Sequence, residues 1–291
     1  METVELKTVR RSACEAHPVF LNSIRHAQPH RSMLTEYFGE RHWHHKSLES
    51  CVASGMQLAE DAGEPFTWLT CANSGSSEVC EAALRFMGVS EDELASGYFC
   101  DPTAKSNLRI VAKRGIMIRL TRNFDKQRGF VNGALAAVCD SLRGDAVFTA
   151  RLVGAGNMVL IHPMEEKGER FLPCCYGYAT TIRRAQGADL YHGCIYFDQK
   201  SRVAARGYGY VACSRFKFRT GCYLYGKLRQ NDFLPVGPEL EDEVLERGYE
   251  SVSSADSDGR GLEYAMNDSQ QDDADALELV QDQGNLLQDF L

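Results

Sequence analysis

Five short β-prone runs in residues 108–165 constrain the fold of this chain more than any other feature. They read LRIVAK, GIMIRL, GFVNGALAAV, AVFTARLV and NMVLIHP, and glycine, asparagine and aspartate turns separate them. Short strands at close spacing with turn signals between them are typical of a small β-barrel. The flanking sequence has a different character, so we expect a β-rich insert within another kind of domain.

Before the insert, the pattern mixes helices with a strand. Apolar spacing predicts helices at 17–28 and 45–62. PFTWLTC (65–71) is a short β-prone run, and a helix is predicted after it at 74–88, ending at a glycine. SEDE at 90–93 has the pattern of a capping box that opens another short helix.

After the insert, strands and helices alternate again. CCYGYATT, CIYFD and CYLYG read as strands, with helices predicted around 182–187 and 201–214. Four strands, at 66–70, 175–180, 193–197 and 221–225, are therefore expected to share one sheet. The alternation predicts an α/β domain that the β-rich region interrupts.

The charge of the chain is divided unevenly along its length. The net charge is −8, but residues 239–291 hold 16 acidic and 2 basic residues, a net of −14, which leaves +6 for residues 1–238. We expect the acidic tail to be disordered, because it cannot bury enough apolar surface to offset the ordering entropy. Its last apolar residues could form a short helix on a protein partner; the alternative is a solubilising tail.

Composition excludes several classes of protein. Hydrophobic residues make up 44% and charged residues 25%, as in ordinary globular proteins, and no apolar stretch approaches the ~20 residues of a membrane span. The eleven cysteines include no CxxC, and neither HWHH (42–45) nor the Cys174–Cys175 pair has a second ligand pair, so we expect no metal site. No secretory signal is readable. We expect an intracellular protein, with the nucleus first and an organelle as the alternative.

One stretch, YGYATTIRRAQGADL (176–190), indicates anion binding. It reads as a strand that ends and leads into a short helix, and in open α/β sheets ligands lie beyond the carboxyl ends of strands. A helix N-terminus there offers free N–H groups. Thr180 and Thr181 add hydroxyls, and Arg183 and Arg184 add positive charge. The alternative is a β-turn with exposed basic residues.

A second stretch, GYGYVACSRFKFRTGCYLYGKL (207–228), identifies a family resemblance. TIRRAQG (181–187) resembles the fifth motif of superfamily-one DNA helicases of the PIF-type and RecD-type branch, usually Thr/Ser-Ile/Val-His-Lys-Ser/Ala-Gln-Gly. YVACSR (210–215) resembles the sixth, usually Tyr-Val-Ala-Leu-Ser/Thr-Arg. Two departures concern the grip on DNA, because Arg183 replaces a usual histidine and Phe216 a usual small residue.

Three further segments are similar to the same family. GIMIRLTRNFDKQRGFVNGALAAV resembles the segment that opens the SH3-like barrel, domain 2B; Asn123, Asn132 and Gly133 match, and Ala136 stands where a second glycine is usual. WLTCAN (68–73) resembles the start of the second RecA-like domain. LKTVRRSACEAHPVFLNSIR resembles the fourth motif, with Arg11 as its arginine.

The resemblance covers residues 5–235 and implies an α/β chain that is the C-terminal half of a helicase. It implies a helical lead-in at 1–64 from the end of the first RecA-like domain, and a RecA-like P-loop NTPase-type second domain, 2A, at 65–105 and 172–238. The SH3-like β insert, 2B, would span 106–171, and the disordered acidic tail 239–291.

The ATP-binding half of such an enzyme is missing from the sequence. No G-x-x-x-x-G-K-[ST] occurs; GCYLYGKL (221–228) is nearest, but Leu228 replaces the metal-binding hydroxyl residue, and CYLY reads as a strand. No apolar strand ends in an Asp-Glu pair, and SEDELA (90–95) lies in a capping context. Those parts supply the phosphate cradle and the metal ligand. The first RecA-like domain is therefore expected elsewhere, in the same gene or on another chain, and this chain alone is predicted to be inactive.

The resemblance implies a role for each matching residue. ATP and Mg²⁺ would bind between the two RecA-like domains, with Arg215 as the arginine finger, Arg11 as a second γ-phosphate contact, and Gln186 and Gly187 as nucleotide sensors. We expect Arg215, Gln186 and Arg11 on one side of the sheet, at the strand carboxyl ends. Single-stranded DNA would be gripped by six residues: Thr70, Asn73, Thr180, Thr181, Arg183 and Arg184.

Two functions remain open at this point. The chain is either the translocating half of an ATP-dependent DNA helicase, of a family that serves DNA repair and recombination, or a non-catalytic nucleic-acid-binding or protein-binding remnant of that fold. Fold alone does not decide between them.

Overall fold

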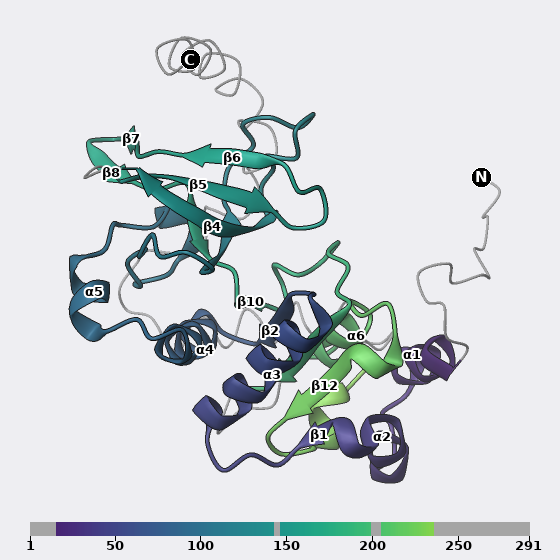
Figure 1. Cartoon of the computed structure of the whole chain (residues 1–291). Coiled ribbons are helices and arrows are strands. Elements are labelled where there is room, and N and C mark those ends of the chain that lie inside the picture. Colours follow the sequence, from purple (N-terminus) through teal and green to yellow (C-terminus); the bar gives the residue numbers. More distant parts are fainter. Residues whose placement is uncertain (1–15, 143–145, 199–204, 236–291) are drawn as a thin grey trace, which may run out of the picture.

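The computed structural model describes residues 16–142, 146–198 and 205–235, which form two β-sheets with helices packed around one of them (Figure 1). Arg11 and the predicted acidic tail, 239–291, lie outside the described residues. Within the described residues, no helix is long and apolar enough to cross a membrane.

The first sheet is parallel throughout and has five strands. Their order is β1 (His42–Trp43), β12 (Cys222–Tyr225), β11 (His192–Tyr196), β2 (Phe66–Thr70) and β10 (Ala179–Thr181). The prediction that four strands share a sheet is confirmed for those at 66–70, 193–197 and 221–225, whereas only the end of the run at 175–180 joins them, as β10. The inner strand β2 is buried along its whole length, as a parallel strand covered on both faces should be.

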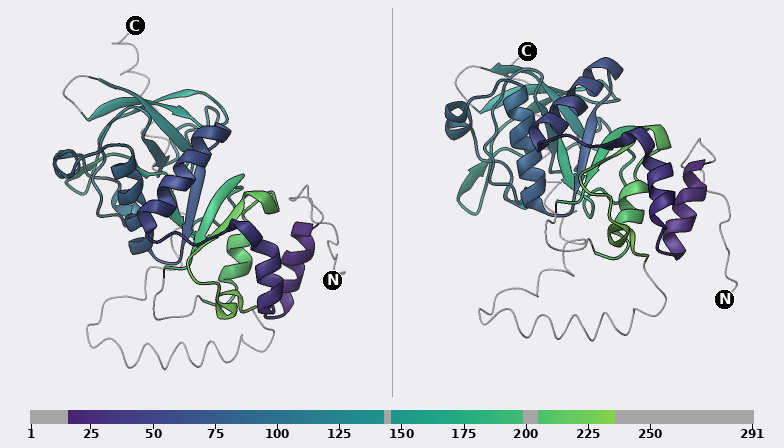
Figure 2. Two further views of the ribbon diagram at one scale, coloured as in Figure 1. Left: turned by 60° about the horizontal axis from the view of Figure 1, so that its bottom comes forward. Right: turned by 90° about the horizontal axis from the view of Figure 1, so that it is seen from below.

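Helices cover both faces of this sheet, which makes an α/β layer structure (Figure 2). One face carries α3 (Leu48–Ala62) and α4 (Asn73–Phe86), and the other carries α1 (Ala16–His26), α2 (Arg31–Phe38) and α6 (Tyr208–Cys213). The described part of the expected lead-in, 1–64, therefore belongs to this layer, since β1 lies at the sheet edge and α1 and α2 pack on the sheet.

Local sequence accounts for the ends of these helices and for their close packing. Ser47 caps α3 by accepting from the Ser50 N–H, and Ser90 and Glu93 form the predicted capping box of α5 (Glu91–Ser96). Gly55 lets α3 approach β2 closely, because a Cβ there would lie 2.7 Å from Trp68 Cη2. Trp68 itself is fully buried.

The second sheet is antiparallel and forms the upper part of Figure 1. Its order is β6 (Met158–Ile161), β5 (Val147–Leu152), β4 (Leu135–Leu142), β3 (Met117–Leu120) and β9 (Cys174–Tyr176), and a separate hairpin joins β7 (Met164–Glu166) to β8 (Glu169–Phe171). The β-prone runs after residue 114 become β3 to β6. The prediction that LRIVAK forms a strand is wrong. Its backbone pairs only at Ile110, in an isolated bridge with Tyr98.

One predicted strand divides between the two sheets. The run at 175–180 is not continuous: β9 pairs with β3, whereas β10 pairs with β2. Gly177 lies between them, where a Cβ would lie 2.8 Å from Leu135 Cδ2 and 3.0 Å from the Ile118 carbonyl. The chain can change sheets here because glycine leaves room for β3 and β4 to pass close by.

Two predicted helices differ from the observed structure. Residues 182–187 form consecutive turns that end at Gly187, whose φ of +90° favours glycine and stops a helix. The helix predicted at 201–214 is α6, which begins only at Tyr208; residues 199–204 lie outside the described residues.

Candidate nucleic-acid interface

The turn after β10 carries the fifth-motif residues. Thr180 and Thr181 end the strand and are buried, whereas Arg183 and Arg184 are exposed. The Thr181 hydroxyl accepts from the Arg184 backbone N–H at 3.3 Å, which fixes the first turn. The strand therefore ends with its two threonines packed inward and its two arginines outward.

The turn from β2 into α4 lies beside it in the sheet. Thr70 is fully buried; its hydroxyl donates to the Ala72 carbonyl at 2.9 Å and shares a 2.7 Å hydrogen bond with the Ser76 hydroxyl. Asp198 accepts from the backbone N–H groups of Cys71, at 2.7 Å, and Ala72, at 3.3 Å. Thr70, expected to contact DNA, thus shapes the turn that places Asn73 at the start of α4.

These two turns and the antiparallel sheet enclose a cleft of about 650 Å³. Five of the predicted site residues line it: Asn73, Thr180, Arg184, Gln186 and Gly187. The opposite side comes from the loop before β3, from β3 itself and from the loop before β4, which contribute Lys105, Arg119, Asn132 and Gly133. Segments far apart in the sequence therefore converge on one hollow between the two sheets.

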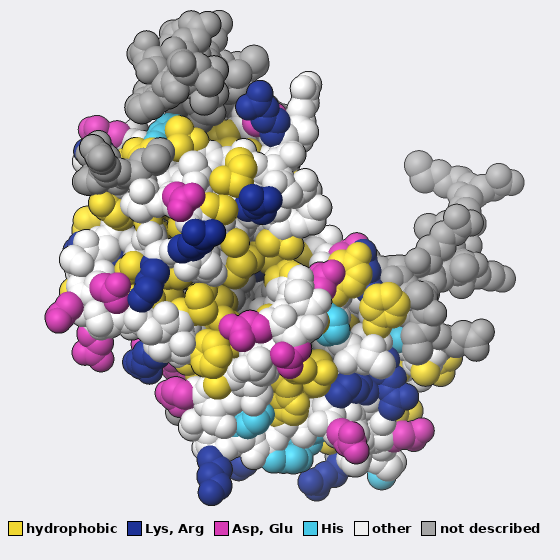
Figure 3. Space-filling model, viewed as in Figure 1, with side chains coloured by type: hydrophobic (Ala, Val, Ile, Leu, Met, Phe, Trp, Pro, Cys, Tyr) yellow, Lys and Arg dark blue, Asp and Glu magenta, His cyan; other side chains and the backbone are white. Residues whose placement is uncertain are grey.

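The charge of this cleft has a single sign. Acidic and basic side chains are interspersed over the face of the molecule in Figure 3, and the whole chain is acidic. By contrast, no Asp or Glu occurs among the described residues that line the cleft, while Lys105, Arg119 and Arg184 do. A cleft with cations, hydroxyls and amides, and with no lining carboxylate, is suited to a polyanion.

Arg119 lies deepest of the three cations. It is half-buried on β3; Nη1 donates to the Gly133 carbonyl at 3.2 Å and Nη2 to the Gly177 carbonyl at 3.4 Å. Its Nε is buried and has no hydrogen-bond partner among the described residues. Burial lowers the pKa of the guanidinium from its usual value, yet arginine keeps its charge at neutral pH. An anionic ligand would offset the cost of burying this group.

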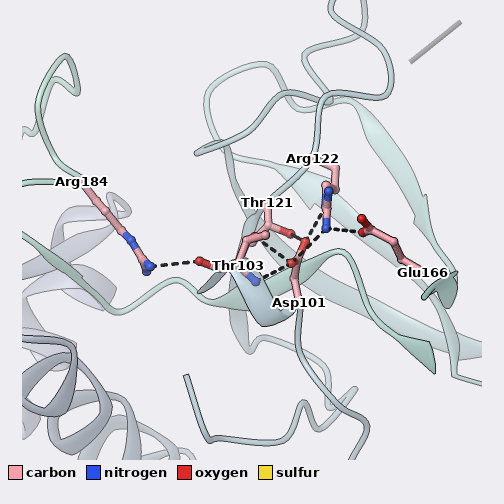
Figure 4. Close-up of polar contacts among 6 residues, drawn as sticks. All are labelled: Asp101, Thr103, Thr121, Arg122, Glu166 and Arg184. Atoms are coloured by element: carbon pink, nitrogen blue, oxygen red, sulfur yellow. Dashed lines mark hydrogen bonds and ion pairs between the residues drawn. The ribbon is translucent and has the colours of Figure 1, made fainter. Parts of the chain in front are cut away.

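Backbone carbonyl groups, rather than other side chains, orient the guanidinium of Arg184. Nη1 donates to the Ala104 carbonyl at 2.6 Å, and Nη2 donates to the Thr103 carbonyl at 3.1 Å. Figure 4 shows the contact with Thr103. These two carbonyls belong to a short 3₁₀ helix, Pro102–Ala104. Two of the five N–H groups of the guanidinium are used in this way, and the other three have no acceptor among the described residues.

Four of the predicted residues that the structure describes do not line the cleft, and one of them is Thr70, which is buried in the turn from β2 into α4. Thr181 is buried behind the turn, Arg183 is exposed outside the cleft, and Arg215 lies elsewhere. Arg11 lies outside the described residues.

Arg215 lies at the amino ends of the parallel strands, whereas we expected it at their carboxyl ends. Its carbonyl accepts from the Leu190 N–H at 2.8 Å, and Phe216 pairs with Leu190 just before β11, so this segment lies at the strand amino ends. The chain returns to the amino ends of the strands before β11 starts, and the spacing of the motifs in the sequence does not reveal this return. Arg215 Nε donates to the Val211 carbonyl at 3.2 Å and Nη2 to the Ser214 hydroxyl at 2.9 Å.

The described residues do not fit a nucleotide cradle of their own. In GCYLYGKL, Cys222–Tyr225 is β12, an inner strand of the parallel sheet with Cys222 and Leu224 fully buried, so it cannot wrap a phosphate. Glu93 of SEDELA is engaged in the capping box. No cluster of three His, Cys, Asp or Glu that could hold a metal ion occurs among the residues that the structure describes.

Sequence reasoning missed two of the three cleft cations, Lys105 and Arg119. Strand alternation places Arg119 on the face of β3 opposite the buried Ile118 and Leu120. This alternation was present in the sequence, but the residues that Arg119 faces across the cleft come from the parallel sheet, and alternation does not identify them. Lys105 follows the 3₁₀ helix in the left-handed region, at φ +50°, and no motif marks it.

Comparison with known proteins identifies the fold. No protein-family model and no curated protein sequence matches the chain. Among solved structures, a Pif1 helicase from Bacteroides in complex with ADP-AlF3 and ssDNA is 18% identical, with a TM-score of 0.56, over 85% of this chain and 57% of that one. Bacteroides Pif1 bound to ssDNA is 19% identical, with a TM-score of 0.56, over 86% of this chain and 57% of that one. Pif1 from Candida albicans is 16% identical, with a TM-score of 0.55, over 86% of this chain and 60% of that one.

The chain thus spans a little over half the length of the solved helicases that it matches. At this level of identity the likeness concerns the fold and leaves activity to be established separately. The described residues share the fold of the solved Pif1 helicases.

Proposed function

We propose that this chain is the part of an ATP-dependent DNA helicase that grips single-stranded DNA. The observation that carries the proposal is the cleft between the two sheets, with three cations and no acidic residue among its described lining residues. Phosphate contacts of this kind dominate the affinity of proteins for nucleic acids. The matching Bacteroides Pif1 structures contain ssDNA, which supports the same class of ligand.

In this proposal residues 65–105 and 172–238 are the second RecA-like domain, and 106–171 are an SH3-like insert that forms the opposite wall of the cleft. Asn73, Thr180, Arg184, Lys105 and Arg119 contact the phosphates. The grip thus depends on both sheets, so a movement of the parallel sheet against its insert would change the hold on the strand.

The nucleotide is assigned largely to another domain, in the same gene or on another chain. ATP with Mg²⁺ would bind there, with Arg11 as a γ-phosphate contact and Gln186 and Gly187 sensing it. Arg215 lies at the strand amino ends, away from Gln186, so its role as the arginine finger is not retained. The support is family resemblance and the ADP-AlF3 bound to the Bacteroides Pif1. Alone, this chain would bind DNA without hydrolysing ATP.

Titration of a labelled single-stranded oligonucleotide, followed by fluorescence anisotropy, tests the grip. Lys105→Gln removes an exposed cation of the cleft, and Lys46→Gln is the matched control, an exposed lysine outside it. Loss of one phosphate contact should lower the slope of log affinity against log salt by about 0.7, and the control should keep the wild-type slope.

Two results would contradict the proposal. Binding that does not depend on salt, or equal slopes for Lys105→Gln and wild type, would remove the cleft as the DNA site. No binding at all by the wild-type chain would favour a protein-binding remnant of the fold.

A further inference from the structure

A buried carboxylate, Asp101, lies behind the wall of the cleft and is hydrogen-bonded on both oxygens. Oδ1 accepts from the Thr103 N–H at 2.8 Å and the Thr103 hydroxyl at 2.7 Å; Oδ2 accepts from the Thr121 hydroxyl and from Arg122 Nε, each at 2.7 Å. Arg122 Nη2 adds a contact to Oδ1 at 3.3 Å. A carboxylate offers about four lone-pair sites, so Asp101 is saturated with donors.

Asp101 is held in its charged form. Burial by itself would raise its pKa, but the hydrogen bonds from Arg122, Thr121 and Thr103 outweigh burial, and the pKa lies below its usual value. An asparagine would turn an NH₂ group toward donors on one side and leave buried partners unpaired. The geometry around Asp101 therefore depends on a carboxylate.

This carboxylate fixes the position of the 3₁₀ helix Pro102–Ala104. Asp101 is the N-cap of that helix and accepts from Thr103. The helix then presents two carbonyls to Arg184, that of Thr103 (Figure 4) and that of Ala104. Lys105 follows directly as its C-cap. Two of the three cations of the cleft therefore take their position from a helix that Asp101 anchors.

The contacts of Asp101 also connect, through Arg122, to the hairpin of β7 and β8. Arg122 follows β3 and uses Nη2 to contact Glu166 at 3.0 Å, on β7 (Figure 4). The contacts thus form a chain from Glu166 through Arg122, Asp101 and Thr103 to Arg184. Glu166 is half exposed, whereas Asp101 is fully buried, so removal of Asp101 should have much the larger effect.

We infer that Asp101 is a positioning residue for phosphate binding: it anchors Pro102–Ala104 so that Arg184 and Lys105 face the cleft together. The inference rests on the proposed grip on single-stranded DNA. It assigns a role to a residue that touches no ligand and belongs to none of the matched helicase motifs.

The variants Asp101→Asn and Arg122→Lys test this role, and Glu166→Gln is the control. Arg122→Lys keeps the net charge, so any change in its salt slope must come from geometry. Both test variants should weaken ssDNA binding about three- to tenfold, the size of the net contribution of one ordinary hydrogen bond, and lower the salt slope. Glu166→Gln should stay within about twofold of wild type. Measurements are made well below the melting temperature of each variant.

A background that lacks the two positioned cations separates positioning from general stability. In Lys105→Gln/Arg184→Ala, adding Asp101→Asn or Arg122→Lys should change the affinity by less than about twofold, because no positioned cation remains. Should Asp101→Asn fail to fold, Arg122→Lys carries the same comparison.

The outcomes distinguish this inference from the proposed function. If wild type binds and Lys105→Gln/Arg184→Ala weakens binding, but both test variants bind like wild type, the positioning role is refuted and the cleft stands. An equal loss in the wild-type and Lys105→Gln/Arg184→Ala backgrounds would also refute it, as a purely structural effect. If wild type does not bind single-stranded DNA, both fall.

Discussion

Gly75 in the first turn of α4 should not tolerate a side chain, although glycine is normally unfavourable in a helix. A Cβ at Gly75 would overlap the Asp198 carboxylate, with Asp198 Cγ at 2.5 Å and Cβ at 2.8 Å. That carboxylate accepts from Cys71 and Ala72 at the turn that leads into the cleft. Gly75→Ala must therefore displace Asp198 or shift the start of α4.

Two effects of opposite sign decide the size of the change. A hydrogen bond to a charged acceptor contributes about 1.5–3 kcal/mol, and the 2.7 Å contact to Cys71 is the one at risk. Alanine in place of glycine in a helix returns about 0.5–1 kcal/mol. We expect Gly75→Ala to lower the free energy of unfolding by about 1–2 kcal/mol, or about 2–4 °C in melting temperature for each kcal/mol.

The assay is urea and thermal unfolding, followed by circular dichroism, in two backgrounds. In Asp198→Gly, which removes the three atoms nearest to the new Cβ, Gly75→Ala should become neutral or stabilising by about 0.5–1 kcal/mol. The control Ser74→Ala, at an exposed position of the same turn, should stay within about 0.5 kcal/mol. The same destabilisation by Gly75→Ala in both backgrounds would refute the reasoning.

Three further predictions follow from the same geometry. With three cations in the cleft, ssDNA affinity should fall about 15- to 20-fold between about 50 and 200 mM salt, and anisotropy titrations that show no such fall would contradict the cleft assignment. Burial is the main influence on the buried His17 and lowers the pKa of its imidazole, and the hydrogen bond with the Phe216 carbonyl only partly opposes this shift. His17 therefore favours the neutral form in the folded state. Stability should therefore fall as pH drops below about 6.5; His17→Gln should reduce this pH dependence of the melting temperature, and the exposed His26→Gln should retain it. The isolated chain should release no phosphate from ATP above background, since its nearest Walker-like run is strand β12; hydrolysis stimulated by ssDNA would show that a cradle had been overlooked.

The parts of the fold that local sequence encodes were predictable. The strands β2, β11 and β12 follow from short apolar runs, and the capping box at Ser90 and Glu93 follows from spacing alone. The turn after β10 was predicted to bind an anion, and its Arg184 lines the cleft; anion binding itself stays a prediction. These features depend on residues close together in the chain.

The remainder depends on pairing between distant segments. The change of sheets at Gly177 follows from where β3 and β4 lie, and nothing within CCYGYATT marks it. Arg119 becomes part of the cleft only because β9 and β10 join the two sheets. Arg215 lies at the strand amino ends because the chain recrosses the sheet before β11. Periodicity shows which face of a strand is polar, but not what that face will meet.

The edge strand β1 has a consequence for how the molecule can assemble during synthesis. His42 pairs with Leu224, so one of the earliest described strands waits for one of the last to leave the ribosome. The antiparallel hairpin of β4 and β5 needs only neighbouring residues, and local contacts form faster than distant ones. The insert can therefore fold while the parallel sheet is still open. Until β11 and β12 arrive, α1 and α2 lack most of the surface that they pack on, and their apolar sides are exposed to chaperones or to aggregation.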